Sequence, residues 1–136
     1  MNRTALFAYQ LLIGLSDTMT GALLIVAPQL TLRLMHLTAP ADALVYLSFI
    51  GAFVMAVGLS CLCGAYLTWC DGCKNNLEMV WLLTAILRAS VAVFVTTQVI
   101  AGALEAGWIA VALFDGACVL IQAIGLRKGW LIHAVR

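Results

Sequence analysis

Four long apolar stretches take up most of this chain: residues 5–27, 43–69, 77–101 and 107–127. Each is close to the about 20 residues that a helix needs to cross a hydrocarbon core of about 30 Å. Charged residues are 10% of the 136 positions, well below the roughly 25% typical of soluble domains. Strand-like alternation is absent, and backbone groups in lipid must be satisfied within the segment. We therefore predict an all-α, integral membrane four-helix bundle that forms one transmembrane domain over residues 1–136.

The ends of these stretches carry helix boundary signals. Pro28 ends the first stretch, and Asn75 with Glu78 three residues later resembles a capping box that opens the third. Residues 28–37 have leucines on one side and polar residues on the other, which favours a short interfacial helix. Asp17 would interrupt the hydrophobic core of a signal peptide, so we keep the first helix in the mature protein. An aromatic belt at the membrane interfaces is expected from the four tryptophans: Trp69, Trp81, Trp108 and Trp130.

Basic residues are divided unevenly between the two ends of the helices. One end has only Arg33, whereas the other has five: Arg3, Lys74, Arg127, Lys128 and Arg136. By the positive-inside rule, both termini and the loop 70–76 face the cytoplasm, and the connections 28–42 and 102–106 face outward. We expect a multi-pass protein of the cytoplasmic (inner) membrane with its N- and C-termini in the cytoplasm.

Three ionisable residues lie within the apolar stretches: Asp17, Arg88 and Asp115. Counted from the same end of the bundle, all three are about 16–18 Å deep at 1.5 Å of rise per residue. Charges in hydrocarbon are unfavourable, so they turn inward and pair, and the arginine fork can bridge two carboxylates. We predict a buried midplane cluster with a formal charge of −1, in which one aspartate is protonated or a further donor approaches. Three polar residues are candidates for that support: Thr18, Thr84 and Gln122.

Small residues share the faces that carry these charges. Gly14 and Gly21 flank Asp17 on the first helix, and a seven-residue spacing relates Gly51 and Gly58 on the second. Small residues allow the close backbone approach that drives helix association in lipid. Three roles for the cluster remain open: an ion-pair network that fixes helix register, a polar site for a ligand or cofactor, and a proton or ion relay.

Cysteines are the second candidate for chemistry. Cys70 and Cys73 form a C-x-x-C pattern in a loop, a spacing found in redox pairs and metal sites. Placed in the reducing cytoplasm, the two are expected as free thiols, with redox activity as the alternative. No metal site is expected, because four zinc ligands cannot be assembled near this loop.

Several function classes lack their sequence signatures. A bis-histidine haem site is excluded because His36 and His133 belong to opposite ends of the bundle. Nucleotide-binding glycine loops, the serine-hydrolase elbow and the zincin helix are missing, so an enzyme is not favoured. A net charge of +1 gives no support for nucleic-acid binding.

The chain resembles small bacterial DoxX-like four-helix membrane proteins. The resemblance rests on the architecture, on the glycine-rich segment from Gly51 to Gly58, and on the lone Arg88 of the third helix. It implies a subunit associated with quinone or sulfur redox chemistry, and a quinone or a lipid as the bound molecule.

These observations leave three functions open. The first is a non-catalytic accessory or structural subunit of a larger membrane complex, consistent with the short loops. The second is a DoxX-like redox or hydrophobic-ligand-binding protein that uses the cluster, and the third is a transporter component that works as an oligomer. The expected partners are the lipid bilayer and other membrane subunits or further copies of the chain.

Overall fold

The computed structural model describes residues 2–70 and 73–131, and within them it contains helices and no strand. Four helices are long: α1 (Arg3–Val26), α3 (Leu44–Leu67), α4 (Lys74–Ile100) and α5 (Ile109–Arg127). The short helix α2 (Pro28–Leu34) follows α1, and the 3-10 turns η1 (Ala41–Ala43) and η2 (Ala106–Trp108) precede α3 and α5. The predicted all-α four-helix bundle is confirmed.

The four long helices are apolar enough to cross a membrane. Candidate spans are Arg3–Val26, Ala41–Leu67, Asn75–Ile100 and Ala106–Arg127, each longer than the about 20 residues that a bilayer requires. Most of their large apolar side chains point away from the bundle, as expected where lipid rather than water surrounds the helices. The chain is therefore a small multi-pass membrane protein.

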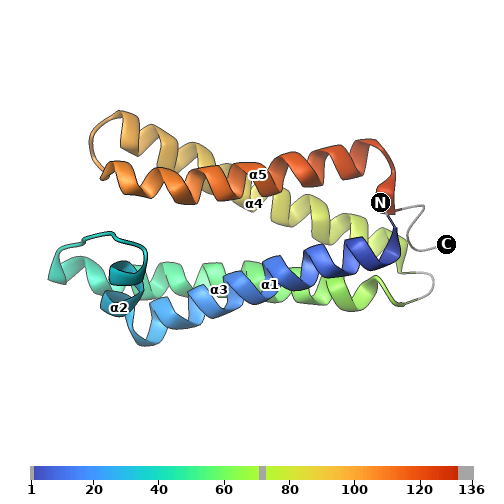
Figure 1. The fold of residues 1–136 in the computed structure, drawn as a ribbon, viewed down its shortest axis with the longest axis horizontal. Helices are drawn as coiled ribbons and strands as arrows, with labels where there is room; N and C mark the ends of the chain where they lie inside the picture. The colour runs from blue at the N-terminus through green and yellow to red at the C-terminus, as the bar shows by residue number, and fades with distance from the viewer. Residues whose placement is uncertain (1, 71–72, 132–136) are drawn as a thin grey trace.

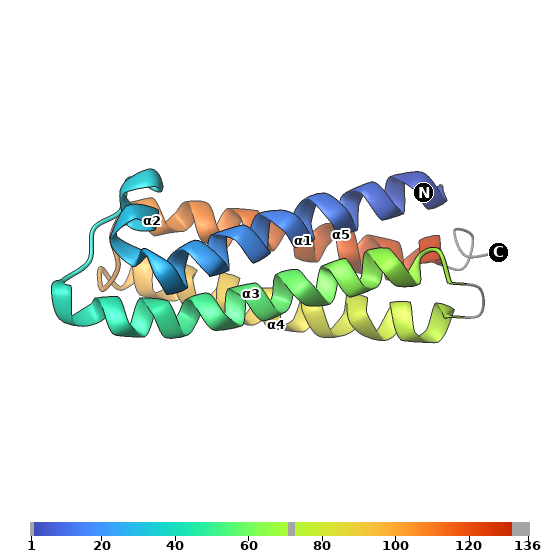
Figure 2. The same ribbon diagram turned by 90° about the horizontal axis from the view of Figure 1, so that it is seen from below.

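The long helices associate as two antiparallel pairs. Figures 1 and 2 together place α1, α3, α4 and α5 in that order around a rough square. The pairs α1 with α3 and α4 with α5 pack most closely, and the contact between α3 and α4 is smaller. Along their described residues, α1 and α5 make no close backbone approach. Figure 1 also shows α3 and α4 close together where α4 begins and farther apart where it ends.

Two names for the ends of the bundle are used below. The N-terminal end holds the start of α1, the end of α3, the start of α4 and the end of α5. The α2 end holds α2, η1, η2 and the turn between α4 and α5.

Glycine explains the tight packing of α1 on α3. A Cβ atom added at Gly21 would lie 2.4 Å from the backbone nitrogen of Met55, and one added at Gly58 would lie 2.4 Å from that of Thr18. Real Cβ atoms are not found at such distances, so the two backbones touch where only glycine fits. The seven-residue spacing of glycines on both helices repeats this contact two turns further along.

An apolar cluster closes each end of the bundle. At the N-terminal end, four side chains are at most 1% exposed: Leu6, Leu77, Trp81 and Leu131. At the α2 end, Leu32 of α2 packs with Leu37 and Leu47, and the Thr38 hydroxyl donates a hydrogen bond to the Glu105 carboxylate. That bond links the connection after α2 with the turn between α4 and α5.

Two expectations about the N-terminal end are wrong. Trp81 does not face the membrane interface, because Gly125 of α5 leaves room for its ring: a Cβ atom at Gly125 would lie 2.5 Å from Trp81 Cζ3. Asn75 does not cap α4, since the helix already begins at Lys74 with Cys73 as its N-cap residue.

Candidate functional site

The structure brings the three interior charges together. The Arg88 Nη1 donates to Asp115 Oδ1 at 2.6 Å, and its Nη2 donates to Asp17 Oδ2. Arg88 is 3% exposed, and the two aspartates are 8% and 9% exposed. Because α1, α4 and α5 each supply one residue, this Asp17–Arg88–Asp115 cluster ties one helix pair to the other.

Local sequence explains why each charge points inward. Asp17 lies between Gly14 and Gly21 on the buried side of α1, and Asp115 lies one turn from the buried Cys118 on α5. Arg88 follows Trp81 and Thr84 at helical spacing, on the side of α4 that faces the other helices. Each charge thus occupies the side of its helix that the neighbouring helices cover.

The charges in the cluster do not cancel. Two carboxylates and one guanidinium sum to −1, and the guanidinium uses both terminal nitrogens on the carboxylates. Breaking such a pair leaves an uncompensated charge and typically costs about 3–5 kcal/mol. The cluster is therefore a strong restraint on the relative position of the helices that it connects.

Two thiols and a phenol surround the cluster. The Cys61 thiol of α3 and the Cys118 thiol of α5 are about 5% and 3% exposed, and both lie within the range of the Arg88 charge. The Tyr9 hydroxyl lies close to the Cys118 thiol. Helical spacing alone places Cys118, three residues after Asp115, on the same side of α5, whereas sequence reasoning missed Tyr9 and Cys61.

The three polar support candidates do not bond to the carboxylates. Gln122 Nε2 donates to Thr84 Oγ1 at 2.8 Å, and the Thr84 hydroxyl donates to the carbonyl of Val80 at 2.7 Å. Thr18 Oγ1 lies buried with no hydrogen-bond partner among the described residues. Thr84 and Gln122 therefore form a separate polar contact one turn from Arg88, toward the N-terminal end.

The C-x-x-C pattern connects α3 with α4. Cys70 and Cys73 are half-buried, and the Cys73 backbone N–H donates to the Cys70 carbonyl at 3.4 Å. Residues 71 and 72 between them lie outside the described residues. Within residues 2–70 and 73–131, no cysteine forms a disulfide, and no three His, Cys, Asp or Glu side chains are grouped to hold a metal ion.

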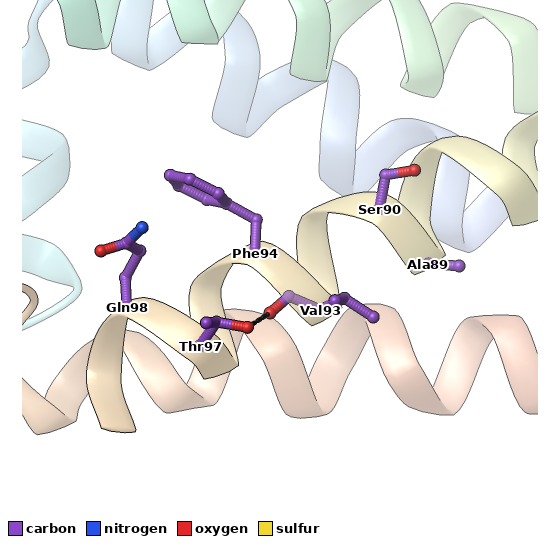
Figure 3. Close-up of a pocket in the computed structure, with 6 residues that line it drawn as sticks. All are labelled: Ala89, Ser90, Val93, Phe94, Thr97 and Gln98. Carbon is purple, nitrogen blue, oxygen red and sulfur yellow. Dashed lines mark hydrogen bonds between the residues drawn. The ribbon is translucent and has the colours of Figure 1, made fainter. Parts of the chain in front are cut away.

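An open groove of about 520 Å³ lies on α4 beyond the cluster, toward the α2 end. Its lining consists of six residues of this one helix: Ala89, Ser90, Val93, Phe94, Thr97 and Gln98. Figure 3 shows Ser90, Phe94 and Gln98 pointing to the same side of α4. At 100° per residue, Val93 and Thr97 lie roughly opposite to Arg88 and face the membrane, whereas Gln98 lies about 80° from Arg88 and is half-buried.

The polar groups of this groove differ in how they are satisfied. The hydroxyls of Ser90 and Thr97 donate to the carbonyls of Ile86 and Val93 of their own helix. The amide of Gln98 makes no hydrogen bond to any described residue. Sequence reasoning missed the groove, and its only signal was a polar stripe at positions 90, 97 and 98 within an apolar helix.

Comparisons with protein-family models, with curated proteins and with solved structures found no match to this chain.

Proposed function

We propose that this protein is a non-catalytic subunit of a larger membrane complex, and that its α4 groove binds a transmembrane helix of a neighbouring protein. The observation that carries this proposal is the groove itself, which has the exposed Ser90 and Thr97 and the half-buried Gln98 in its lining. The Ser90 and Thr97 hydroxyls donate to their own helix, but lipid tails offer the Gln98 amide no hydrogen bond, whereas a neighbouring helix does. Ala89 and Ser90 are small, and small residues let a second helix approach closely.

The interior cluster supports a structural rather than a catalytic role. Both terminal nitrogens of Arg88 are already bonded to carboxylates. The third nitrogen, Nε, has no hydrogen-bond partner among the described residues, but it is buried and Arg88 is 3% exposed, so a quinone headgroup would have to separate the packed helices to reach it. For this reason we place the interaction with other molecules at the groove and not at the cluster.

The proposed location is the cytoplasmic membrane, with both termini in the cytoplasm. Among the described residues, Arg3, Arg127 and Lys128 lie at the N-terminal end, and Arg33 lies at the α2 end. Lys74 opens α4 at the N-terminal end, and Arg136 lies outside the described residues. This distribution favours the N-terminal end on the cytoplasmic side.

Photocrosslinking in intact cells tests the groove. A benzophenone amino acid replaces Val93, which is 67% exposed in the groove, or Leu113, which is 68% exposed on α5. We expect the residue 93 probe, and not the residue 113 probe, to yield one defined crosslink to another membrane protein. Two differently tagged copies of the chain show whether that protein is a second copy.

The outcomes separate the proposal from its rivals. A specific heterologous adduct that Gln98→Leu weakens supports the subunit function. Adducts only between the two tagged copies indicate self-association, and adducts with lipid alone contradict the proposal. Equal, diffuse crosslinking from positions 93 and 113 contradicts it as well, because the groove would then be no different from any lipid-facing surface.

A further inference from the structure

The interior of the bundle carries an unbalanced negative charge. Asp17 and Asp115 share the single guanidinium of Arg88. Every other Lys, Arg and His of the sequence lies at an end of a long helix or outside the four long helices. An isolated buried charge is so unfavourable that the group usually neutralises instead. We infer that the cluster binds one exchangeable proton, on a carboxylate oxygen that Arg88 leaves unused, and that this proton exchanges with the N-terminal end of the bundle. This inference goes beyond the proposed subunit function.

None of the other groups that face the cluster can supply the missing positive charge. The phenol of Tyr9 on α1, the thiol of Cys61 on α3 and the thiol of Cys118 on α5 lie within range of Arg88. All three are neutral acids, whose ionisation would make the cluster more negative. On α4, Arg88 is the only titratable residue at this depth. A proton on Asp17 Oδ1 or Asp115 Oδ2 therefore gives the simplest neutral state, because Arg88 bonds to the other oxygen of each carboxylate.

The N-terminal half of the interior contains polar atoms that the protein does not satisfy. Tyr9 Oη, Trp81 Nε1 and Gln122 Oε1 are buried and have no hydrogen-bond partner among the described residues. The indole N–H can only donate, and the amide oxygen can only accept. Buried polar atoms of native proteins are almost always satisfied by protein or by ordered water, and water both donates and accepts. Tyr9 and Gln122 lie on the N-terminal side of the Asp17–Arg88–Asp115 cluster, and Trp81 belongs to the apolar cluster that closes that end, so the three atoms can support proton exchange toward it.

The other half of the interior is more apolar. The side chains that fill it beyond the cluster are apolar, among them Leu24, Val95 and Ala112, each at most 7% exposed. The one strongly buried hydroxyl near the α2 end, that of Thr31, donates to the Ala27 carbonyl at 3.0 Å. Among the described residues, the α2 side has one buried polar atom without a partner, Thr18 Oγ1 beside Asp17, against three on the N-terminal side, so we expect the exchange to run toward the N-terminal end.

Infrared spectroscopy of the reconstituted full-length protein tests the bound proton. With ¹³C-labelled aspartate, we expect one protonated carboxyl band near neutral pH in the wild type. Asp17→Asn and Asp115→Asn should each abolish the band, because one carboxylate and one guanidinium then balance. Asp42→Asn, which changes an exposed aspartate in η1, should leave the band unchanged.

Three results would overturn the proton site. The first is absence of the band in the wild type, and the second is its persistence in both asparagine variants. The third is a band that appears only after sodium is replaced by choline. The last result would identify a sodium ion as the compensating charge. Because two different asparagine variants are measured, a folding failure of one of them still leaves the inference testable.

Hydrogen–deuterium exchange of the same band tests the direction. Gln122→Leu and Tyr9→Phe should slow the exchange by about tenfold, the factor expected when the barrier rises by the free energy of about one hydrogen bond. Thr31→Val, at the α2 end, should leave the exchange rate unchanged. If Thr31→Val slows the exchange, or if neither Gln122→Leu nor Tyr9→Phe does, the path through the N-terminal half is wrong.

Discussion

Arg88 is the residue on which the interior depends, because it bonds to side chains from both helix pairs. A lysine at this position would keep the positive charge but would lose the planar fork that serves two carboxylates at once. Phe114 adds an aromatic face 5.7 Å from the guanidinium carbon, which also favours arginine. The identity of this side chain matters as much as its charge.

Removal of the guanidinium should destabilise the protein strongly. We expect Arg88→Gln to lower the free energy of unfolding by about 3–5 kcal/mol, since two buried carboxylates lose their partner. Arg88→Lys should lower it by less. The measurement is an unfolding titration in mixed micelles, with Arg33→Gln as the control because Arg33 is exposed on α2. Equal stability of the Arg88→Gln and Arg33→Gln proteins would refute this role.

Sequence could predict these interior charges because physics restricts them so strongly. A charged side chain within a membrane-spanning helix is unfavourable in lipid, so it turns toward the other helices and pairs there. Depth and helical spacing were therefore enough to group Asp17, Arg88 and Asp115. Trp81 was misjudged because a tryptophan near a helix end usually marks the interface. Its burial depends on Gly125, a residue 44 positions later (125 − 81 = 44), and the sequence does not show that the two meet.

At the scale of helices, the glycine contacts make α1 and α3 the tightest pair of the bundle. The same spacing of seven residues on both helices keeps the contact in one register through two turns. Sequence revealed the small residues on each helix, but it did not show which glycine meets which backbone. It also placed the start of α4 at residue 77, whereas the helix begins at Lys74. A helix start depends on the path of the preceding connection as well as on a capping pattern.

Added methyl groups should separate this pair. We expect Gly21→Ala and Gly58→Ala each to lower the free energy of unfolding by about 1–3 kcal/mol, because the new Cβ overlaps a backbone atom of the facing helix. Gly116→Ala on α5 is the matched control, since no atom lies within 4 Å of its added Cβ. Thermal unfolding followed by circular dichroism measures the difference. Similar melting temperatures for all three variants would show that the backbones are not in contact.

At the scale of the whole molecule, the two helix pairs are joined at few places. The Asp17–Arg88–Asp115 cluster joins them in the middle. The apolar cluster at the N-terminal end joins them through Leu6, Leu77, Trp81 and Leu131. The Thr38–Glu105 hydrogen bond joins the loops at the α2 end. Only the pairing of α4 with α5 follows from a local feature, the short turn between them. Pairing of α1 with α3, and the divergence of α3 from α4, depend on the summed packing of many side chains and are not encoded in a local pattern.

Thiol labelling should reveal how this molecule is oriented. In a Cys63→Ala, Cys70→Ala background, we expect an impermeant maleimide to modify Cys73 in inside-out vesicles and not in intact spheroplasts, because we propose that the basic end faces the cytoplasm. A cysteine introduced by Ala103→Cys, in the exposed turn between α4 and α5, should show the opposite pattern. The reverse result for both cysteines would invert the proposed topology.

The distance along the chain between Asp17 and Arg88 has a consequence for biogenesis. The partners are 71 residues apart, so at 5–20 residues per second the ribosome needs roughly 4–14 s to deliver Arg88 after Asp17. The glycine contacts let α1 and α3 associate within that interval, while α4 is still being made. An arrest-peptide force profile measures the pulling force on the nascent chain. This force should rise when Arg88 enters the membrane, and Asp17→Asn should reduce the rise. In co-translational insertion, the Asp17 carboxyl would therefore enter the membrane seconds before its partner Arg88 is made.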